Sequence, residues 1–285
     1  MPSLIDIRRR IRSVKNTQQI TKAMKMVSAA KLRRAHDRVI AARPYGEALG
    51  KMLADVAASA AAAGEVSDPL LESRPERRVL LALITSDKGL AGAFNSNLIR
   101  AAQRFIDERE AGSVTLVCAG RKGRDFFRKR GAAIAGEHIG LASKARYEDA
   151  AAIARQAMNL FRAGEIDAVY LLYNEFKSVM TQKLTLMRAL PAPAPESVEP
   201  GGYIFERPAA ALLAELLPRY VETEFYKAVV ESVASEHAAR MTAMEAATSN
   251  AAEMIDKLTL HMNRVRQASI TREIIEVVGG AVAAE

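Results

Sequence analysis

The most suggestive chemical motif in the sequence is a glycine-bearing turn at residues 86–92, Ser-Asp-Lys-Gly-Leu-Ala-Gly, between an apolar run and a helical stretch. Open α/β sheets hold phosphate groups on turns in that position. The dinucleotide fingerprint, however, needs G-x-G-x-x-G, and a P-loop needs a lysine after its last glycine. Lys88 precedes the glycines instead, so the sequence favours a tight structural or partner-facing turn. Its candidate contact residues are Asp87, Lys88, Gly89 and Ala91.

A second motif, at residues 121–130, mixes basic residues with Phe126 and Phe127. Such a run can stack bases and neutralise phosphates, so nucleic-acid binding is one interpretation. The alternative is that the two phenylalanines anchor a helix against a sheet while the charges face solvent or another polypeptide. The four histidines show no convergent ligand spacing, and local context suggests no Ser/His/Asp or Cys/His arrangement. We therefore expect no catalytic centre, no cofactor and no metal.

Composition describes a globular chain without membrane spans. Its 285 residues, 49% of them hydrophobic, can bury a substantial core in one or two domains. The single cysteine, Cys118, excludes an intramolecular disulfide framework and fits a reducing compartment. No run approaches the roughly 18 apolar residues that a transmembrane helix needs. We therefore expect no direct membrane insertion.

The positive charge is concentrated at one end of the chain. Residues 1–43 hold 12 Lys/Arg against two acidic residues, a net charge of +10, although the whole chain carries only +8. An acidic partner for this segment is one interpretation, and a solvated helix face is the other. A cleaved transit peptide is a further rival for this arginine-rich stretch, but the regular spacing of its apolar residues argues against it.

The amino-terminal segment has the spacing of a coiled-coil helix. Ser3, with Asp6 three residues later, has the pattern of a capping box that would begin the helix. A narrow seam recurs in steps of three or four, which is typical of a helix that pairs with another helix. The predicted seam consists of Leu4, Ile7, Ile11, Val14, Gln18, Thr21, Met24, Ser28, Leu32, Ala35 and Val39.

The carboxy-terminal segment repeats the pattern with an average step of 3.5 over 35 residues, the heptad period of a left-handed supercoil. Pro218 is expected to begin or kink this helix, because proline lacks the backbone donor that a helix interior needs. His237 falls on the seam, where we expect a packed, hydrogen-bonded histidine. The predicted seam consists of Val230, Val233, His237, Met241, Met244, Ala247, Ala251, Ile255, Leu258, Met262 and Val265.

The two helical segments are expected to pair with each other. They are the two heptad-bearing segments of comparable length, and a folded insert that can reverse the chain lies between them. A parallel homodimer is the alternative, but its seam usually carries Leu, Ile or Val, whereas this seam contains Ala, Ser, Thr, Gln and His. An antiparallel pair within one chain is therefore favoured.

The middle of the chain alternates strand and helix signals, which is typical of a parallel sheet with crossover helices. The fold expected is α/β: a long antiparallel coiled coil with an inserted Rossmann-like open α/β domain. We expect a coiled-coil helix at 1–63, the α/β domain at 78–206, and the second coiled-coil helix at 208–285. Strands are expected at 79–84, 114–117, 168–173 and 182–190, helices at 93–110 and 148–161, and a mobile loop at 191–202.

Both ends of the chain resemble the gamma subunit of the proton-translocating (F-type) ATP synthase family, in its bacterial form and closely also in its mitochondrial form. The resemblance rests on residues 11–27, IRSVKNTQQITKAMKMV, on 235–241, SEHAARM, and on 266–273, RQASITRE. Residues 270–283 follow the family's signature pattern. The turn at 86–92 also resembles the family's middle domain, where relatives often carry cysteine or glycine near Ala91 and Ala93.

The resemblance implies a non-catalytic central-stalk rotor that couples proton-driven rotation of the c-ring to ATP synthesis or hydrolysis. Its coiled coil would enter the alpha/beta hexamer and make the catalytic sites differ, while the α/β domain would lie beside the epsilon subunit and the c-ring. By family position, Arg266 and Gln267 would touch a beta-subunit loop, and Lys22, Met24 and Lys25 would lie opposite acidic beta loops. The tail at 279–284 would end in an apolar bearing.

The same resemblance implies a peripheral position at the cytoplasmic face of the bacterial inner membrane, and it leaves open an inhibitory subunit as a further partner. Two alternatives come from other classes. A nucleotide-binding α/β protein predicts a phosphate loop, and a coiled-coil nucleic-acid binder predicts a basic region ahead of a leucine-rich zipper. The sequence has neither pattern, so we expect no nucleic-acid partner.

Overall fold

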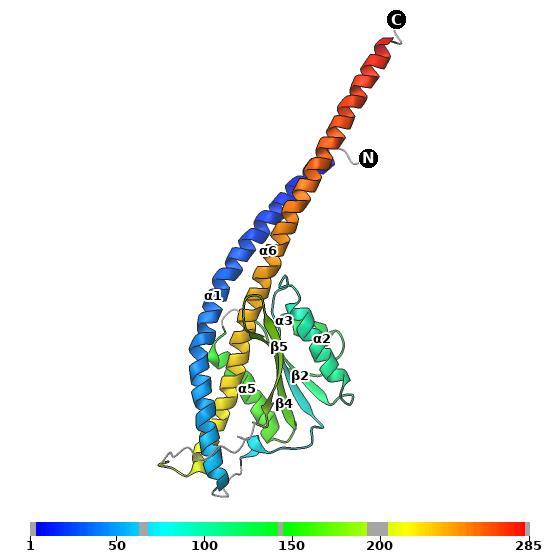
Figure 1. The fold of residues 1–285 in the computed structure, drawn as a ribbon. Coiled ribbons are helices and arrows are strands. Elements are labelled where there is room, and N and C mark those ends of the chain that lie inside the picture. The colour runs from blue at the N-terminus through cyan, green and yellow to red at the C-terminus, as the bar shows by residue number, and fades with distance from the viewer. Residues whose placement is uncertain (1–3, 63–67, 142–144, 193–204, 283–285) are drawn as a thin grey trace. The chain divides into compact units, whose positions relative to one another are not determined.

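The computed structural model describes residues 4–62, 68–141, 145–192 and 205–282. Two long helices enclose a mixed α/β region along the chain (Figure 1). The elements in order are α1 (Leu4–Ala62), the 3-10 helix η1 (Pro69–Leu71), β1 (Val79–Ile84), α2 (Phe94–Asp107), β2 (Val114–Ala119), α3 (Arg121–Arg128), β3 (Ile134–His138), α5 (Tyr147–Arg162), β4 (Ala168–Phe176), β5 (Gln182–Leu190) and α6 (Ala209–Val282).

The five strands form one sheet in the order β3-β2-β1-β4-β5. Strand β1 pairs in parallel with β2 and β4, β2 pairs in parallel with β3, and β5 runs antiparallel to β4 at the edge. All six residues of β1 are buried, as expected for a central parallel strand covered on both faces. The order 3-2-1-4 is the arrangement of a Rossmann-like sheet, so the predicted fold class is confirmed.

Helices cover both faces of this sheet. Helices α2 and α3 lie on one face, and α5 and part of α6 lie on the other (Figure 1). The first face is closed by Leu98 of α2 and Phe127 of α3, which pack with Leu81 and Leu83 in one core cluster. Helix α2 faces the sheet because its apolar residues recur every three or four positions; the buried ones are Phe94, Leu98, Ala102 and Phe105.

Residues 29–240 form one compact unit, which contains the sheet and parts of both long helices. Within it, α1 and α6 run in opposite directions. Arg43 Nη2 lies 3.6 Å from Glu231 Oε1, and a Cβ atom added to Gly46 would lie 3.7 Å from Thr223 Cγ2. As residue numbers rise along α1, the numbers of the contacted residues fall along α6, which is the register of an antiparallel pair.

Residues 1–28 and 241–285 form the second unit, and its two helical segments are also antiparallel. The hydroxyls of Thr21 and Thr248 lie 2.7 Å apart, and Lys25 forms an ion pair with Glu245. One turn forward on α1 is therefore matched by about one turn backward on α6.

The predicted seams are confirmed at the level of side-chain burial. Every position predicted for the α1 seam and for the α6 seam is buried or half-buried, including the polar ones. Thr21 and Ser28, for example, are 8% and 2% exposed. The strand and helix predictions for the middle of the chain agree with the observed elements to within a few residues at each end.

Strand β3 was not predicted from the sequence; its residues Ile134–His138 alternate between half-buried and exposed. Helix α6 begins at Ala209, so Pro218 lies inside the helix and does not begin it. The turn before Pro218 holds strong helix formers and buries Leu213 and Leu217, which offsets the lost backbone bond. The expected cap at Ser3 and most of the loop at 191–202 lie outside the described residues.

Candidate functional site

The turn after β1 is held in shape by its own polar side chains. Ser86 is fully buried, and its backbone N–H donates to Asn95 Oδ1 at 3.0 Å while its Oγ donates to the carbonyl of Lys88 at 2.6 Å. Leu90 adopts a positive φ of 62° and is 65% exposed. The turn therefore presents Lys88 and Leu90 outward on a rigid base, and Ala91 is buried beneath it.

Asp87 joins the turn to two neighbouring segments. Its carboxylate accepts hydrogen bonds of 3.0 Å from the backbone N–H of Arg121, at the start of α3, and from that of Gly140. Both oxygens are used in this way, so Asp87 acts inside the protein as a brace. Of the predicted contact residues in the turn, Lys88 is the exposed one that carries a charge.

A buried ionic cluster on α6 holds the other side of the turn. Arg240 Nη2 lies 2.7 Å from Glu236 Oε1, and both side chains are less than a tenth exposed. The same nitrogen donates to the carbonyls of Lys88 and Gly89 at 3.4 and 3.2 Å. A guanidinium has five donors in a fixed plane, so one side chain can hold a carboxylate and a turn together.

His237 completes this cluster as a neutral group. Burial, with the positive charge of Arg240 as a second cause, lowers the pKa of His237 to about 4. Its Nδ1 lies 3.3 Å from Arg240 Nη1, and it is the acceptor because a guanidinium can only donate. The packed, hydrogen-bonded histidine expected on the seam is therefore present. Burial raises the pKa of Glu236, and Arg240 opposes that rise.

Helix α6 also occupies the crevice where open α/β sheets usually bind ligands. Such ligands lie beyond the carboxyl ends of the strands where the strand order reverses, which here is between β1 and β4. Ser232 Oγ donates to the carbonyl of Ile84 at 3.3 Å, and Ser235 Oγ donates to that of Asn174 at 3.0 Å. The chain's own helix thus fills the position that a nucleotide would take.

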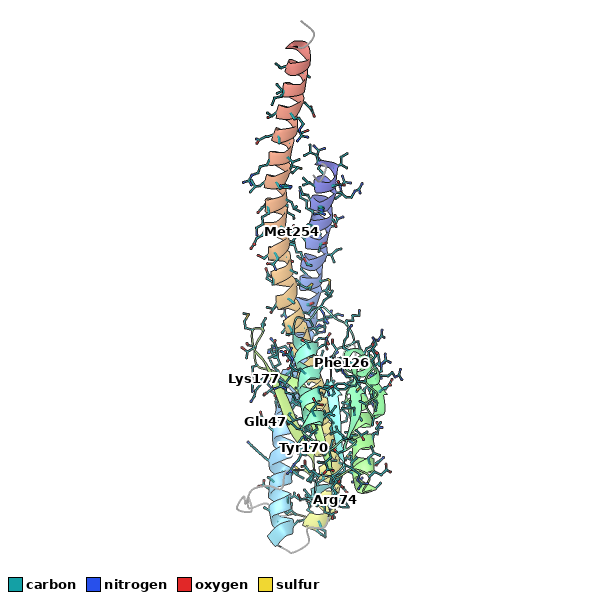
Figure 2. The ribbon with its side chains drawn as sticks, turned by 90° about the vertical axis from the view of Figure 1, so that its right-hand side faces the viewer. Glu47, Arg74, Phe126, Tyr170, Lys177 and Met254 are labelled. Carbon is teal, nitrogen blue, oxygen red and sulfur yellow. The ribbon has the colours of Figure 1, made fainter. Side chains whose placement is uncertain are left out.

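The basic run on α3 has a structural role for its aromatic residues. Phe127 is 1% exposed, and Phe126, labelled in Figure 2, packs edge-on against it with ring centroids 5.0 Å apart. Arg130 lies over the Phe126 ring at 3.7 Å, and Arg124 pairs with Asp125. The phenylalanines anchor α3, as the second interpretation of this motif expected.

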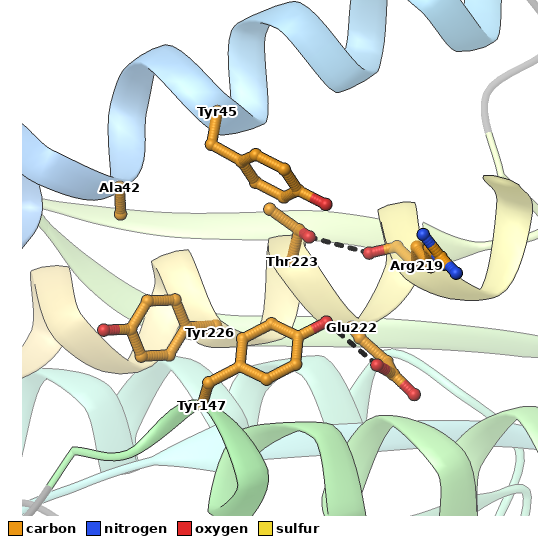
Figure 3. Close-up of a pocket in the computed structure, with 7 residues that line it drawn as sticks. All are labelled: Ala42, Tyr45, Tyr147, Arg219, Glu222, Thr223 and Tyr226. Carbon is orange, nitrogen blue, oxygen red and sulfur yellow. Dashed lines mark hydrogen bonds between the residues drawn. The ribbon is translucent and has the colours of Figure 1, made fainter.

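A tyrosine-lined cavity of about 570 Å³ lies between α1, α5 and α6 (Figure 3). Tyr147 donates to Glu222 Oε2 at 2.9 Å, and Arg155 Nε donates to the other carboxylate oxygen at 2.6 Å. Burial and this bond raise the pKa of Tyr147 to about 12. Tyr226 packs edge-on against Tyr147 at 5.6 Å. Glu222 is thus committed to two partners and serves to join α5 to α6.

The predicted contact residues on the terminal helices differ in their surroundings. Lys22, Arg266 and Gln267 are exposed, and Met24 is half-buried on the seam. Lys25 pairs with Glu245 on the facing helix, a contact that sequence reasoning missed. The structure brings Lys22, Met24 and Lys25 together on neighbouring turns of α1, and Arg266 and Gln267 lie next to each other on α6.

Among the described residues, no group of three or more histidine, cysteine or acidic side chains lies close enough together to hold a metal ion. Among the described helices, none has a stretch apolar and long enough to cross a bilayer.

The terminal helices pair antiparallel, and one of them fills the ligand crevice of the inserted Rossmann-like sheet, which defines the class of coiled-coil proteins with an inserted α/β domain. Comparison with known proteins agrees with this class. Residues 3–284 match the family model described as ATP synthase, and the chain is 71% identical over its full length to the full-length ATP synthase gamma chain of Solibacter usitatus (strain Ellin6076). The chain belongs to the ATP synthase gamma chain family.

Solved structures show the same fold. A chain in the central stalk and c-ring structure of the Tetrahymena thermophila mitochondrial ATP synthase is 27% identical, with a TM-score of 0.61, and 80% of this chain and 99% of that chain are covered. A chain of the Euglena gracilis mitochondrial ATP synthase is 20% identical with a TM-score of 0.70, covering 98% and 94%. The chain is a central-stalk rotor subunit of a bacterial ATP synthase, and neither the nucleotide-binding nor the nucleic-acid-binding alternative is favoured.

Proposed function

We propose that this chain is a non-catalytic rotor that couples rotation of a c-ring to ATP synthesis or hydrolysis in an alpha/beta hexamer. The observation that carries the proposal is the antiparallel pairing of α1 with α6, marked by Thr21–Thr248 and Lys25–Glu245. A two-helix shaft built from one chain has no symmetry of its own. It therefore presents a different face to each catalytic site of a symmetric ring, which makes the sites differ in turn as it rotates.

The absence of catalysis in this chain is supported by the way its polar groups are used. Asp87 is bonded to two backbone N–H groups, Glu222 is bonded to Tyr147 and Arg155, and Glu236 is paired with Arg240. A general base must be free to take a proton from a substrate. These carboxylates are instead structural, and Ser232 and Ser235 of α6 close the crevice at the sheet.

We assign the contacts with the hexamer to two groups on the terminal helices: Lys22, Met24 and Lys25 on α1, and Arg266 and Gln267 on α6. The +10 charge of residues 1–43 suits acidic loops of the hexamer. Residues 270–278 of α6 expose Ile270, Ile274, Ile275, Val277 and Val278 at 49–73%. Apolar contacts have no preferred direction, so an apolar sleeve around this end would hold it while allowing it to turn.

We assign the α/β domain, 78–206, to the membrane side of the complex, beside the epsilon subunit and the c-ring, with the coiled-coil helices at 1–63 and 208–285. In this proposal the turn at 86–92 faces a partner through the exposed side chain of Lys88 and the partly exposed Gly89. Asp87 and Ala91 support the turn from inside the protein, because Asp87 accepts two internal hydrogen bonds and Ala91 is 2% exposed. An inhibitory subunit is a further partner. The complex would lie at the cytoplasmic face of the bacterial inner membrane with this chain as a peripheral component.

The proposal is tested by purifying the chain with its partners and shortening its carboxy-terminal end. The full chain should co-purify with a nucleotide-hydrolysing hexamer, and removal of residues 268–285 should weaken coupling between hydrolysis and proton pumping. The sheet domain should keep its folding cooperativity, because its core is built from residues such as Leu98 and Phe127. Global unfolding of the truncated chain, or full coupling without residues 268–285, would count against this layout.

A control addresses the enzymatic alternative. The isolated full chain should show no saturable binding of ATP or ADP in equilibrium dialysis, because α6 occupies the crevice at the strand ends. Tight nucleotide binding by the isolated chain would reopen the interpretation as a nucleotide-dependent α/β protein.

A further inference from the structure

A second cavity, of about 230 Å³, lies between α1, the turn after β1 and α6. It is next to the buried cluster of Glu236, His237 and Arg240, but its wall is completed by one face of α1. The α1 residues that line it recur at steps of three and four, so they share one face of the helix. The lining residues are Lys31, Arg34, Ala35, Arg38, Asp87, Lys88, Val233, Glu236, His237 and Arg240.

The charge of this lining is unbalanced. Five of its side chains are cationic and two are anionic, and His237 is neutral at physiological pH because burial lowers its pKa to about 4. Both carboxylates already have partners: Asp87 accepts from two backbone N–H groups, and Glu236 pairs with Arg240. Even with Arg38 left aside, the four other cationic side chains outnumber the two carboxylates, so the lining keeps a net positive charge.

The cationic groups include the kind that recognises oxyanions. Arg34 and Lys31 approach from α1 and Lys88 approaches from the turn, and neither Lys31 nor Arg34 forms an ion pair within the described residues. A guanidinium fork binds two oxygens of one tetrahedral anion, and ammonium groups add point charges around it. The cavity volume of about 230 Å³ leaves room for phosphate-sized groups beside α6.

We propose that the cavity lined by Lys31, Arg34 and Lys88 binds a small oxyanion of the phosphate class, such as inorganic phosphate or diphosphate. The anion would join α1 to the turn after β1 by bridging cations that otherwise repel one another. The site differs from a P-loop because its cations come from a neighbouring helix, with no glycine-rich cradle. The proposal does not depend on the rotor assignment, since it concerns a cavity within residues 29–240 of the isolated chain.

The test is isothermal titration of the isolated full chain with diphosphate and with inorganic phosphate, at constant ionic strength set by sodium chloride. We expect saturable binding of one anion per chain, with diphosphate tighter than phosphate because it carries more charge. Arg34→Gln and Lys88→Gln should each weaken binding about tenfold or more, the size expected for loss of one charge-assisted contact. Both residues are exposed, so neither substitution should disturb folding, which circular dichroism would check.

The matched control is Arg33→Gln, because Arg33 is an exposed arginine on the same helix that does not line the cavity. Its substitution should leave the affinity unchanged. Equal weakening by Arg33→Gln and Arg34→Gln would mean diffuse attraction to a basic helix and would overturn the proposal. So would the lack of saturable binding, or complete displacement by chloride alone. None of these outcomes bears on rotation or on co-purification with the hexamer, so the two proposals fail separately.

Discussion

Thr21 and Thr248, which are 227 positions apart in the sequence, bring their hydroxyl oxygens to 2.7 Å. Thr21 Oγ1 also lies 3.0 Å from the carbonyl of Gln18, and Thr248 Oγ1 lies 2.7 Å from that of Met244. These three contacts share two hydroxyl protons, and the two hydroxyls cannot both donate to each other. At least one hydroxyl therefore donates to a carbonyl of its own helix. This polar contact sets the register between the two helices where the seam has few large apolar side chains.

A double-mutant cycle on this pair should reveal direct coupling. Thr21→Val and Thr248→Val keep the side-chain shape, and each should destabilise the helix pair by about 0.5–1.5 kcal/mol through loss of one hydrogen bond. The double variant should be less destabilised than the sum, because each single substitution already removes the contact that the two hydroxyls share. Hydrogen exchange of the flanking amides measures the effect. Strict additivity of the two substitutions would show that the hydroxyls do not interact.

Gly120 should not tolerate any side chain. Its φ is +115°, and an added Cβ would lie 2.1 Å from the carbonyl oxygen of Thr85, which is backbone and cannot move aside. We expect Gly120→Ala to lower the free energy of unfolding by about 4 kcal/mol or more. Gly131 is the matched control: its φ is +70° but no atom lies within 4 Å of an added Cβ, so Gly131→Ala should cost only about 1–2 kcal/mol. Equal costs in chemical denaturation would contradict the predicted clash.

Glu231 should make stability depend on pH. It is 2% exposed, its Oε2 has no hydrogen-bond partner, and its pKa is raised by burial first and by Glu175 second. Because the native pKa of Glu231 is above its unfolded value, the stability that this carboxyl contributes is complete below the ordinary glutamate pKa of 4.5. It is lost as pH rises through the native pKa. The opposing cations are Arg43, Lys177 and Lys227.

Glu231→Gln should therefore stabilise the chain at pH 8 and have little effect near pH 4, where the native carboxyl is already protonated. The loss of the Arg43 contact should reduce this gain in stability only slightly, since Arg43 is 43% exposed and its Nη2 lies 3.6 Å from Glu231 Oε1. Glu47→Gln is the control, because Glu47 is exposed on α1 (Figure 2). Thermal unfolding across pH measures both variants. A Glu231→Gln effect that is constant with pH would show that burial does not perturb this group.

Charge reversal at Lys22 should impair coupling through loss of attraction to acidic loops of the hexamer. Lys22 is exposed, so its interactions are screened by salt, and the defect of Lys22→Glu should be larger at low ionic strength. Lys25→Glu should show a further loss, because it also breaks the pair with Glu245, and this loss should shrink with salt as well, since the two side chains are 40% and 58% exposed. Lys51→Glu, on the same helix but outside the proposed contacts, is the control. ATP-driven proton pumping that is indifferent to salt in Lys22→Glu would refute the electrostatic contact.

The long helices could be predicted because the heptad seam is a local signal that survives polar substitutions such as Gln18 and His237. Strand β3 could not, since an edge strand with a pattern as weakly apolar as Ile134–His138 is held mainly by its pairing with β2. The expected segment at 208–285 begins within one residue of α6, but the sequence left open whether Pro218 begins the helix; the burial of Leu213 and Leu217 outweighs the proline.

The glycines at 86–92 predicted the turn, but the sequence did not predict which side chains hold the turn in place. Glu236 and Arg240 are four residues apart, a spacing that signals a surface ion pair on a helix. Nothing in that spacing shows that both side chains are buried beneath a turn about 150 positions earlier in the chain. The cavity with Arg34 was missed for the same reason, because its wall is assembled from three distant segments.

The most direct test of the rotor assignment is to watch the chain turn. Cys118 is buried, and burial raises its pKa to about 12, so its thiol should not react with a maleimide in the native state. A single cysteine introduced as Glu110→Cys, at an exposed position after α2, can then carry a visible probe on the complex with the hexamer fixed to a surface. On addition of ATP, stepwise rotation of the probe in one direction is expected. ATP hydrolysis with a stationary or randomly reorienting probe would contradict the central claim.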